Sequence, residues 1–406
     1  MRQLLLSILA SLVLFSVQGC SGGGGSSDDI SSGGDDTGSD GNTSTSKSLT
    51  VTTYNLGLLP QFVSLTNERV QPLAQTLSSF SSDVLCLQEV WRTSDRNAIV
   101  AGINSNFPNI FEAPSRQKFT SQTPACTVGD LAPTLECLLT SCAFTDREFT
   151  ECALAECKST LDTLAREDRE CAGAIFAQAG RSSSEISEIQ DELFSSSSPA
   201  GLFAFDGSSG LILASKYELS ERRVVDFFDQ STTSRRVALL ATVTVSGVKH
   251  QIACTHLTSN LDGLVPYTGP FGSWQEEGLA QASRLLSESE STSPTLLAGD
   301  FNCSLRNSET GVASDFAPNC EKIITSGYRD LAGEQLGCSF CSSNSLNQMN
   351  QQVAGTRDLL LDHIFTANLL SPPSSIALAL TERQNIAGQS ANLSDHFAVK
   401  IELAVP

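Results

Sequence analysis

The sequence predicts an α+β fold: a four-layer α/β/β/α sandwich in which two mixed sheets pack face to face and helices cover their outer faces. Eight or more short segments, each apolar or alternating and bounded by turn residues, indicate strands. Helical patterns lie between several of these segments. With 406 residues and 40% hydrophobic content, the chain can bury a large core. This mixture of strands and helices favours two packed sheets with helices outside.

The first twenty residues, MRQLLLSILASLVLFSVQGC, have the pattern of an export signal. One positive residue precedes an uncharged apolar stretch from Leu4 to Val17, which is too short to span a bilayer comfortably. The Gly-Cys ending resembles a bacterial lipobox, so we expect residues 1–20 to be a lipoprotein signal peptide and Cys20 to carry a lipid. Ordinary signal cleavage near this point is the alternative.

Residues 21–47 consist mainly of Ser, Gly, Asp and Thr. Such a composition cannot bury apolar surface, so we expect a disordered tether. A tether after a lipidated cysteine indicates an exported bacterial lipoprotein, anchored through Cys20 to the outer membrane or the cell surface. Residues 48–406 are then the folded domain, which we expect to be a monomer.

The strand and helix patterns follow one another through this domain. Helices are expected over Val70–Ser79 and Gln275–Ser287, where apolar residues recur at helical spacing. The predicted strands are Leu49–Leu56, Asp83–Val90, Gly210–Leu219, Arg236–Gly247, Lys249–Leu257, Pro294–Asn302, Asp358–Ala367 and His396–Leu403.

Residues 120–200 interrupt the strands with a cysteine-rich helical insertion. The stretch DLAPTLECLLTSC has helical apolar spacing, and a second helix is expected to start near Asp146. The thirteen cysteines minus Cys20 leave twelve, an even number in a chain predicted to reach an oxidising compartment. Six of these lie from Cys126 to Cys171. We expect three internal disulfides in a nested arrangement, although six cysteines allow fifteen pairings.

The remaining cysteines are predicted to be structural. Cys338 and Cys341 form a CSFC motif that resembles a redox or zinc half-site, but two structural disulfides among these residues and Cys303 and Cys320 are the favoured interpretation. Inside predicted strands, Cys86 and Cys254 are either buried small hydrophobic residues or the two ends of one bridge.

The charge of the chain argues against one class of function. The sequence has 45 acidic and 25 basic residues, a formal net charge of −20. Electrostatic capture of a polyanion normally shows as clustered Lys and Arg, so this charge argues against it. A phosphate substrate stays possible, because a bound divalent cation supplies a positive field locally.

Polar side chains recur at the ends of the predicted strands. Each one alone is explained by a turn or a solvated strand end. Together they are the inventory that a hydrolase needs to bind a hard metal ion and move protons around a phosphate. The chain has four histidines, and three of them, His256, His363 and His396, lie in these stretches. The candidate site residues are Asn55, Glu89, His256, Asp300, Asn302, Asp362, Asp395 and His396.

A series of motifs in a fixed order carries a family resemblance: TTYNLGLLP, LCLQEVW, GLILASKYEL, CTHL, LLAGDFN, LDHIF and LSDHFAVKIEL. In this order they resemble the endonuclease/exonuclease/phosphatase superfamily over most of residues 49–406. The cysteine-rich insertion is the chief departure. The opening half, with TYNLGLLP, NERVQPLAQTL, DVLCLQEVW and FPNI, is most similar to the neutral sphingomyelinase and phospholipase C-like branch.

The resemblance implies a metal site. Glu89 matches the principal Mg²⁺ ligand of the superfamily and Asn55 matches its neighbour at the metal. Asp395, the acidic residue before the C-terminal histidine, completes the predicted metal set. Carboxylate oxygens suit Mg²⁺, with Mn²⁺ or Ca²⁺ as the other candidates.

The resemblance also implies catalytic roles. Asp300 and Asn302 match an Asp-x-Asn pair in which the aspartate handles the attacking water or a metal and the amide donates to the phosphate. His396 matches the histidine beside the scissile phosphate, and Asp362 matches the carboxylate that orients a histidine. His256 matches a histidine proposed as an acid or phosphate ligand. In-line attack needs a base and relief of charge on the leaving oxygen; we expect His396, held by Asp362, to supply the base.

The favoured function is hydrolysis of a phosphodiester by in-line attack of activated water, with a lipid head group as the substrate. A secreted DNase-type endonuclease or a phosphatase of the same superfamily is the first alternative. A catalytically silent surface binding protein is the second, and the retention of all eight polar positions counts against it.

An aromatic segment after the His256 strand bears on the lipid interpretation. The stretch VPYTGPFGSW contains Tyr267, Phe271 and Trp274. These residues either form an apolar loop that touches lipid or pack on the domain, and the sequence leaves both open.

Replacing Asp300 by asparagine tests whether GDFN is more than a turn. Asparagine is equally suited to such a turn, so a purely structural role predicts a small change in stability and intact hydrolysis. If Asp300 activates water or holds a metal, Asp300→Asn should lower turnover by about 100-fold or more. Steady-state kinetics of the folded variant decide between the two, and near-wild-type hydrolysis would return the motif to the turn interpretation.

Overall fold

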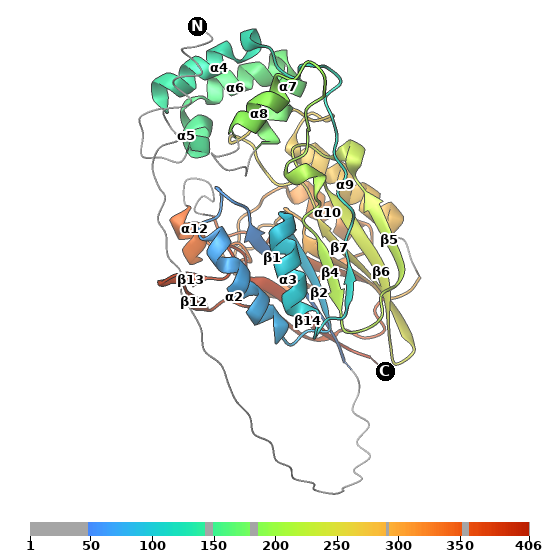
Figure 1. Ribbon diagram of the computed structural model, residues 1–406. Coiled ribbons are helices and arrows are strands. Elements are labelled where there is room, and N and C mark those ends of the chain that lie inside the picture. The colour runs from blue at the N-terminus through green and yellow to red at the C-terminus, as the bar shows by residue number, and fades with distance from the viewer. Residues whose placement is uncertain (1–47, 143–148, 179–185, 290–291, 351–356, 406) are drawn as a thin grey trace, which may run out of the picture.

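Two six-stranded sheets form the centre of the fold (Figure 1). The computed structural model describes residues 48–142, 149–178, 186–289, 292–350 and 357–405. The expected signal peptide and tether lie outside these residues. Among the described helices, none combines the length and the apolar character needed to cross a membrane.

The first sheet has the strand order β11-β14-β1-β2-β4-β3. Only β1 and β2 run parallel in it, and the other neighbouring pairs are antiparallel. Its strands are β1 Ser48–Leu58, β2 Val84–Val90, β3 Asn109–Phe111, β4 Ile212–Ser215, β11 Pro373–Ala379 and β14 Ala398–Ala404.

The second sheet has the order β5-β6-β7-β8-β10-β9, with β7 and β8 as its parallel pair. Its strands are β5 Ser220–Asp226, β6 Val237–Val245, β7 Val248–His256, β8 Thr295–Asp300, β9 Arg329–Asp330 and β10 Asp362–Ala367. A separate hairpin consists of β12 Arg383–Ile386 and β13 Gln389–Asn392.

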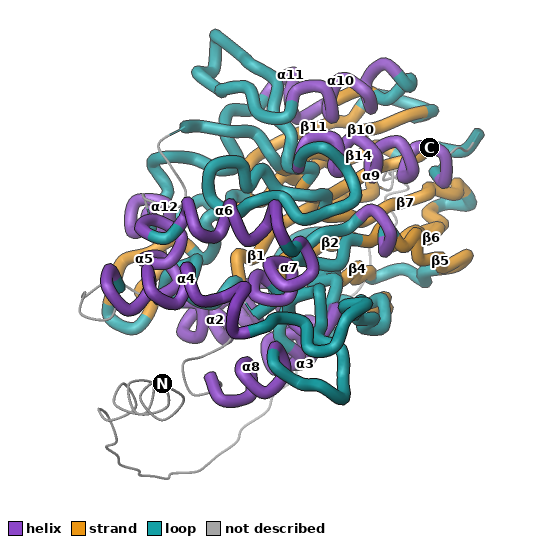
Figure 2. The backbone as a smooth tube through the Cα atoms, turned by 90° about the horizontal axis from the view of Figure 1, so that it is seen from above, coloured by secondary structure: helices purple, strands orange, loops and turns teal. Residues whose placement is uncertain are grey.

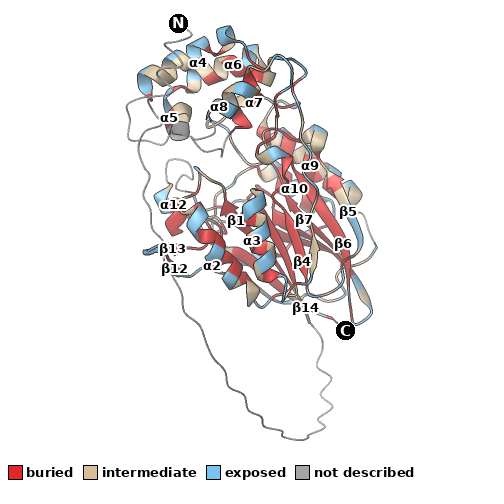
Figure 3. Ribbon diagram, in the orientation of Figure 1, coloured by how far each residue is buried: buried red, intermediate tan, exposed pale blue. Residues whose placement is uncertain are grey.

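Helices cover the outer face of each sheet, so the predicted four-layer sandwich is confirmed. Helices α2 (Thr66–Ser78) and α3 (Thr93–Ile103) flank the first sheet, and α9 (Trp274–Glu288) and α10 (Ala317–Thr325) flank the second. Residues such as Val70, Leu73 and Leu77 recur at helical spacing on the buried face of α2. Figure 3 shows the strands as the most buried part of the molecule.

The core between the sheets is apolar and continuous. It contains Val51 and Cys86 from the first sheet and Leu239, Cys254 and Ala298 from the second, all at most 2% exposed. A disulfide joins Cys86 of β2 to Cys254 of β7, so of the two interpretations of these cysteines the bridge is the right one. The two sheets are therefore linked covalently as well as by packing.

Among the described residues of the disulfide-rich insertion, the structure has five helices. They are α4 Val128–Ser141, α5 Phe149–Glu156, α6 Lys158–Glu167, α7 Arg169–Phe176 and α8 Ile186–Leu193. Figures 1 and 2 show them at the end of the sandwich that carries α12 (Ser345–Met349). The stretch DREFTECALAECKSTLDTLARE, predicted as one helix from near Asp146, forms two helices separated at Cys157, so its predicted extent is wrong. The predicted start lies outside the described residues.

The disulfides of the insertion are nested as predicted. Cys126 pairs with Cys171, and inside this loop lie two further bridges, Cys137–Cys157 and Cys142–Cys152. These bridges staple helices that have a small apolar core of their own. The insertion meets the sandwich through α7, where Gly173 packs closely against Leu202.

The aromatic segment after β7 packs on the domain. Trp274 is 1% exposed, and the ring of Tyr267 meets it edge to face at a centroid distance of 4.9 Å. The Tyr267 hydroxyl donates to Glu277 Oε2 at 2.9 Å. The Phe271 ring is partly exposed, and no contact of this ring is among the ring contacts of the described residues. The interpretation of a packed loop therefore holds for Tyr267 and Trp274.

The bridge between the sheets should contribute more stability than a short bridge in the insertion. Its ends are 168 residues apart, against 10 residues for Cys142 and Cys152. In the chain-entropy model, closing the longer loop restricts the unfolded chain more. We expect Cys86→Ala/Cys254→Ala to lower the free energy of unfolding by roughly 3–5 kcal/mol, and Cys142→Ala/Cys152→Ala by about half as much. Urea unfolding followed by circular dichroism measures both, and equal losses would contradict the expectation.

Candidate active site

Asp300 stands at the centre of a polar cluster at one edge of the sandwich. It is the last residue of β8, and its register partners are His256 at the end of β7 and Asp362 at the start of β10. Because β7 is parallel to β8 and β10 is antiparallel to it, an end of each of the three strands falls at this edge. All three side chains are at most 2% exposed.

The first sheet brings two more of the predicted residues to this edge. Asn55 lies in β1, and its side-chain amide donates to Asp300 Oδ2 at 2.9 Å. This hydrogen bond crosses from one sheet to the other. An irregular register between Asn55 and Leu58 marks a bulge where β1 leaves β2. There Gly57 has a positive φ of 54°, and its amide donates to Asn55 Oδ1 at 2.9 Å.

Glu89 adopts an unusual backbone conformation at the end of β2. Its φ is +57°, in the left-handed region that few residues other than glycine adopt. The side chain is 15% exposed, and Oε1 lies 4.0 Å from His256 Nε2. Such conformations cost about 1–3 kcal/mol and persist where surrounding structure imposes them, often at functional sites. The backbone here directs a carboxylate into the cluster.

The two predicted catalytic histidines approach the same oxygen. His256 Nε2 lies 3.5 Å from Asp300 Oδ2, and His396 Nε2 lies 4.0 Å from it. His396 Nδ1 donates to Asp362 Oδ2 at 2.7 Å. The structure therefore places a carboxylate next to His396, as the resemblance implies, and a ring nitrogen of each histidine near the same oxygen of Asp300.

Asn302 and Asp395 complete the cluster. The Asn302 amide nitrogen of the main chain donates to Asp300 Oδ1 at 2.9 Å, and its side chain donates to the Leu257 carbonyl at 3.0 Å. Asp395 Oδ1 accepts a hydrogen bond from Ser394 Oγ at 3.1 Å. A Cβ atom at Gly57 would collide with this carboxylate. All eight predicted residues thus lie together, while their individual roles stay predictions.

Burial and neighbouring negative charges raise the pKa values of Glu89 and Asp300. Burial, together with the negative charges of Asp395 and Asp300, raises the pKa of Glu89 to about 7. Burial and the neighbouring Asp362 raise the pKa of Asp300 to about 6. Positive charge supplied at this edge would offset both effects.

The two histidines differ in charge. Burial, with the positive charges of Arg236 and His396, lowers the pKa of His256 well below its usual value, so its imidazole is neutral at pH 7. Burial also acts to lower the pKa of His396, but Asp362, Asp395 and Asp300 outweigh it and raise that pKa to about 10. The base role expected of His396 needs an unprotonated imidazole, and it stays a prediction. The proton on His396 suits donation to an anion.

The donor set fits a hard divalent cation. Carboxylate and amide oxygens of Glu89, Asp395 and Asn55 are the ligand types that Mg²⁺ takes, one or two carboxylates with water and substrate filling the rest. Both ring nitrogens of His256 and Oδ1 of Asp362 are buried without a hydrogen-bond partner. Buried polar atoms are rarely left unpaired, so such atoms at one place indicate a site that binds something.

A second set of close ligand atoms belongs to Asp300, Asp362 and His396, which lie within 4.8 Å of one another. His396 already uses Nδ1 for Asp362 and is protonated, so it is a poor metal ligand here. Another such set, Cys303, Cys320 and His363, includes two cysteines that form a disulfide. The acidic set around Glu89 is therefore the better candidate metal site.

Arg236 is a residue of this site that the sequence analysis missed. It directly precedes β6, is 7% exposed, and its Nη1 has no hydrogen-bond partner. Its guanidinium lies 5.5 Å from the ring centroid of Trp91. Burial lowers its pKa, while Glu89 and Asp300 favour its charged form. The stretch SRRVALL, in which two arginines precede an apolar strand in an acidic chain, was the signal in the sequence that pointed to Arg236.

Arg69 supports the cluster from behind and was also missed. This buried residue of α2 donates from Nη1 to the carbonyls of Leu56 and Leu393, each at 2.8 Å, and from Nη2 to the carbonyl of Gly57. One guanidinium therefore ties the segment after Asn55 to the segment before Asp395. Arg69 directly precedes the predicted helix Val70–Ser79, and a charged residue next to its apolar face was the available signal.

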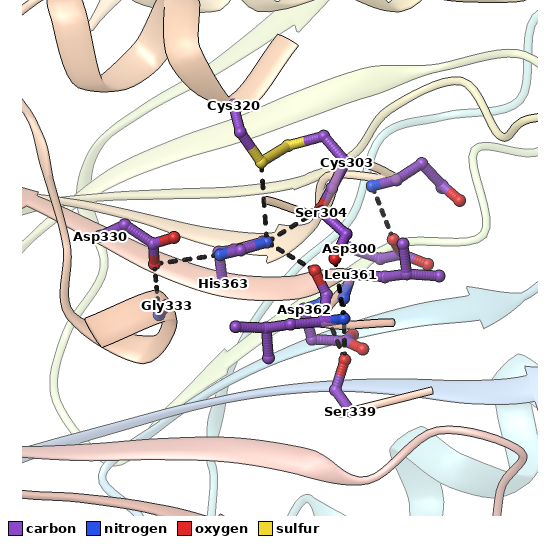
Figure 4. Close-up of a disulfide and its surroundings, with 12 residues drawn as sticks. Asp300, Cys303, Ser304, Cys320, Asp330, Gly333, Ser339, Leu361, Asp362 and His363 are labelled. Atoms are coloured by element: carbon purple, nitrogen blue, oxygen red, sulfur yellow. Dashed lines mark hydrogen bonds and ion pairs between the residues drawn. A yellow bond between two sulfur atoms is a disulfide. The ribbon is translucent and has the colours of Figure 1, made fainter. Parts of the chain in front are cut away.

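His363, the third histidine of these stretches, has a structural role. Its Nδ1 pairs with Asp330 at 3.0 Å, and its Nε2 lies 3.0 Å from the Cys303 carbonyl and 2.9 Å from the Leu360 carbonyl (Figure 4). Burial lowers its pKa, but Asp330 and these hydrogen bonds outweigh burial and raise it to about 9. This imidazolium holds the segment after Asp300 against β10.

The chain belongs to the Endonuclease/Exonuclease/phosphatase family, whose model matches residues 52–396. It is a phosphodiesterase-type hydrolase of that family. A search of curated protein sequences found no match.

Solved structures share the fold. The crystal structure of SmcL is 12% identical, with a TM-score of 0.50, over 88% of this chain and 99% of that one. A double mutant of beta toxin from Staphylococcus aureus, with bound magnesium ions, is 14% identical, with a TM-score of 0.50, over 88% of this chain and 100% of that one. D. rerio TDP2 complexed with a single-strand DNA product is 16% identical, with a TM-score of 0.47, over 87% and 98%.

The pKa of Glu89 predicts how Mg²⁺ binding depends on pH. Folding without a bound metal raises the pKa of Glu89 from 4.5 to about 7. The protonated Glu89 therefore stabilises the folded protein below pH 4.5, and this contribution is lost as pH rises through about 7. A metal needs the ionised form. Mg²⁺ should therefore raise the melting temperature more at about pH 8 than at about pH 6.

Glu89→Gln is the matched control, because it keeps the shape and cannot ionise. Differential scanning calorimetry of both proteins, with and without Mg²⁺, measures the effect. A pH-independent Mg²⁺ shift in the wild type, or an unchanged pH dependence in Glu89→Gln, would contradict the assignment.

Proposed function

We propose that this protein is an exported, Mg²⁺-dependent phosphodiesterase that hydrolyses the phosphodiester of a lipid head group, in the manner of sphingomyelinases and phospholipases C. The observation that carries the proposal is the arrangement around Asp300. Its Oδ2 lies beside two histidines of opposite protonation state and is oriented by the amide of Asn55.

Asp300 is the proposed base for the attacking water. Its pKa of about 6 leaves it ionised at neutral pH but close enough to accept a proton readily. Two hydrogen bonds hold its carboxylate in place: Asn55 Nδ2 donates to Oδ2, and the Asn302 main-chain amide donates to Oδ1. Water placed beside Oδ2 would transfer its proton to that oxygen as it attacks phosphorus.

Three neighbouring groups are proposed to bind the phosphoryl oxygens. His396 carries a proton on Nε2 that Asp362 favours from behind, and Arg236 offers a buried N–H at Nη1 that lacks a partner. His256 is neutral and can donate from one ring nitrogen. Donors aimed at oxygens that gain negative charge stabilise the transition state, and they act strongly in a buried site.

Glu89, Asp395 and Asn55 would hold the divalent cation at the same edge. When bound, the ion neutralises developing negative charge on the phosphate and its leaving oxygen. The side chains of Asp300 and His396 would keep their positions, because each is already fixed by a hydrogen bond within the protein.

The charge of the protein supports a small phosphodiester over a long polyanion. The sequence has 45 acidic and 25 basic residues, a net charge of −20, so the protein as a whole repels a nucleic-acid backbone. The sphingomyelinase-like motifs in the first half of the domain also support a lipid substrate. An anchor at Cys20 would keep a monomeric domain beside a membrane surface.

A substrate panel tests the proposal. The purified protein is assayed with Mg²⁺ on sphingomyelin vesicles, phosphatidylcholine vesicles, plasmid DNA and inositol phosphates. We expect release of a phosphorylated head group from one of the two lipids, loss of all activity in excess chelator, and recovery when Mg²⁺ is added back. Glu89→Gln should lower the rate far more than the stability, since a partly exposed strand-end carboxylate contributes little to folding.

Other outcomes of the substrate panel would favour one of the alternative functions or exclude the metal. Cleavage of DNA without lipid hydrolysis would favour the nuclease alternative, and hydrolysis of inositol phosphates alone would favour a phosphatase. Full turnover in excess chelator would exclude the metal, and inactivity on every substrate would favour a binding protein.

A further inference from the structure

A four-residue disulfide loop lies directly beside the Asp362–His396 pair. Cys338 and Cys341 of the CSFC motif are bonded to each other, as one of the two structural disulfides expected among these cysteines. Cys341 is 3% exposed, and Ser339 between the two cysteines is fully buried. The other pair, Cys303–Cys320, lies nearby behind His363 (Figure 4).

Ser339 contacts the backbone that carries Asp362. Its hydroxyl oxygen accepts two hydrogen bonds, from the amide of Leu361 at 3.0 Å and from the amide of Asp362 at 3.1 Å (Figure 4). One side-chain atom thereby fixes the start of β10, where the chain turns into the site. The Asp362 carboxylate has one oxygen on His396 and the other unpaired, so nothing else among the described side chains holds it.

The same loop contacts the His396 segment. The Ser339 carbonyl accepts a hydrogen bond from the amide of Phe397 at 2.7 Å, and Phe340 forms bridges with both Leu359 and His396. The Phe340 ring lies 5.0 Å from the His396 imidazole, centroid to centroid. The loop therefore inserts between the two segments that carry the pair and contacts each of them.

The third contact reaches the segment of Asp395. The side-chain amide of Asn347 donates to the Cys341 carbonyl and to the Asp395 carbonyl, each at 3.0 Å. Asn347 thus links the loop to this segment, and the loop itself is closed over a sequence separation of only three residues. Such a short bridge restricts the unfolded chain little, so its main effect is on local geometry in the folded protein.

We propose that the Cys338–Cys341 loop is a positioning element for the Asp362–His396 pair, and that reduction of its disulfide lowers turnover without unfolding the protein. The inference rests on the proposed function of that pair. Ser339 and Phe340 act here through Asp362 and His396 and need not touch the substrate.

The reduction is an ordinary thiol–disulfide exchange. A dithiol reductant attacks one sulfur of the bridge, forms a mixed disulfide and is released as its own cyclic disulfide, which leaves Cys338 and Cys341 as two thiols. Two electrons and two protons pass from the dithiol to the bridge. The sulfur of Cys338 is the more accessible one, since that residue is partly exposed.

The test compares Cys338→Ala/Cys341→Ala and Ser339→Ala with a control that removes a bridge in the insertion, Cys142→Ala/Cys152→Ala. Turnover is measured on bis(4-nitrophenyl) phosphate with Mg²⁺. We expect the first two variants to lose about 10-fold or more in kcat, with KM within about two-fold, while the control keeps wild-type kcat. Treatment with dithiothreitol should lower wild-type kcat toward that of Cys338→Ala/Cys341→Ala and should leave that variant unchanged.

Hydrogen–deuterium exchange gives a readout that does not depend on activity. The amides of Leu361, Asp362 and Phe397 should exchange faster in Cys338→Ala/Cys341→Ala and in dithiothreitol-treated wild type, with far-UV circular dichroism unchanged. Wild-type kcat in Cys338→Ala/Cys341→Ala, or unchanged exchange at these amides, would overturn the inference. A wild-type protein that hydrolyses no phosphodiester would overturn the proposed function instead, and exchange at these amides would still decide whether the loop positions the pair.

Discussion

The buried negative charge around Asp300 is the constraint on which the rest of the site depends. Asp300, Asp362, Asp395 and Glu89 all lie at one edge of the sandwich, and Asp300 and Glu89 hold their protons more tightly than usual as a result. Like charges placed close together make ionisation of Asp300 and Glu89 less favourable, and a nearby cation offsets this effect. His396 and Arg236 offset part of the charge. The remainder explains why a divalent ion would bind here.

The two-sheet architecture brings the acidic side chains to one edge, and hydrogen bonds that involve the backbone keep them there. Asn55 reaches Asp300 from the opposite sheet, and Gly57 leaves room for Asp395 at a bulge where a side chain would not fit. Arg69 neutralises nothing by direct pairing; it donates to main-chain carbonyls and so fixes two loops at once. The protein thus uses hydrogen bonds to the backbone to keep repelling side chains together.

Much of the fold and the whole predicted site set could be inferred from local patterns. Polar residues that follow apolar strands, such as Glu89 and Asp300, carry a signal in the sequence because neighbouring strand ends meet at one edge. No comparably strong signal in the sequence points to Arg236, because this residue precedes its strand. Only the pairing of β6 with β7 brings it near His256. The protonation of His396 likewise depends on three carboxylates from distant segments. The helix break at Cys157, whose sulfur is bonded to Cys137, is not revealed by helical spacing alone.

The bridge between β2 and β7 has a geometric effect beyond its part in the core. Cys86 precedes Glu89 by three residues, and Cys254 precedes His256 by two. The disulfide between the sheets therefore lies only a few residues from Glu89 on one sheet and from His256 on the other. Sliding of one sheet over the other would have to bend these short segments. The separation of Glu89 and His256 is therefore restrained by a covalent bond as well as by the packing of the two sheets.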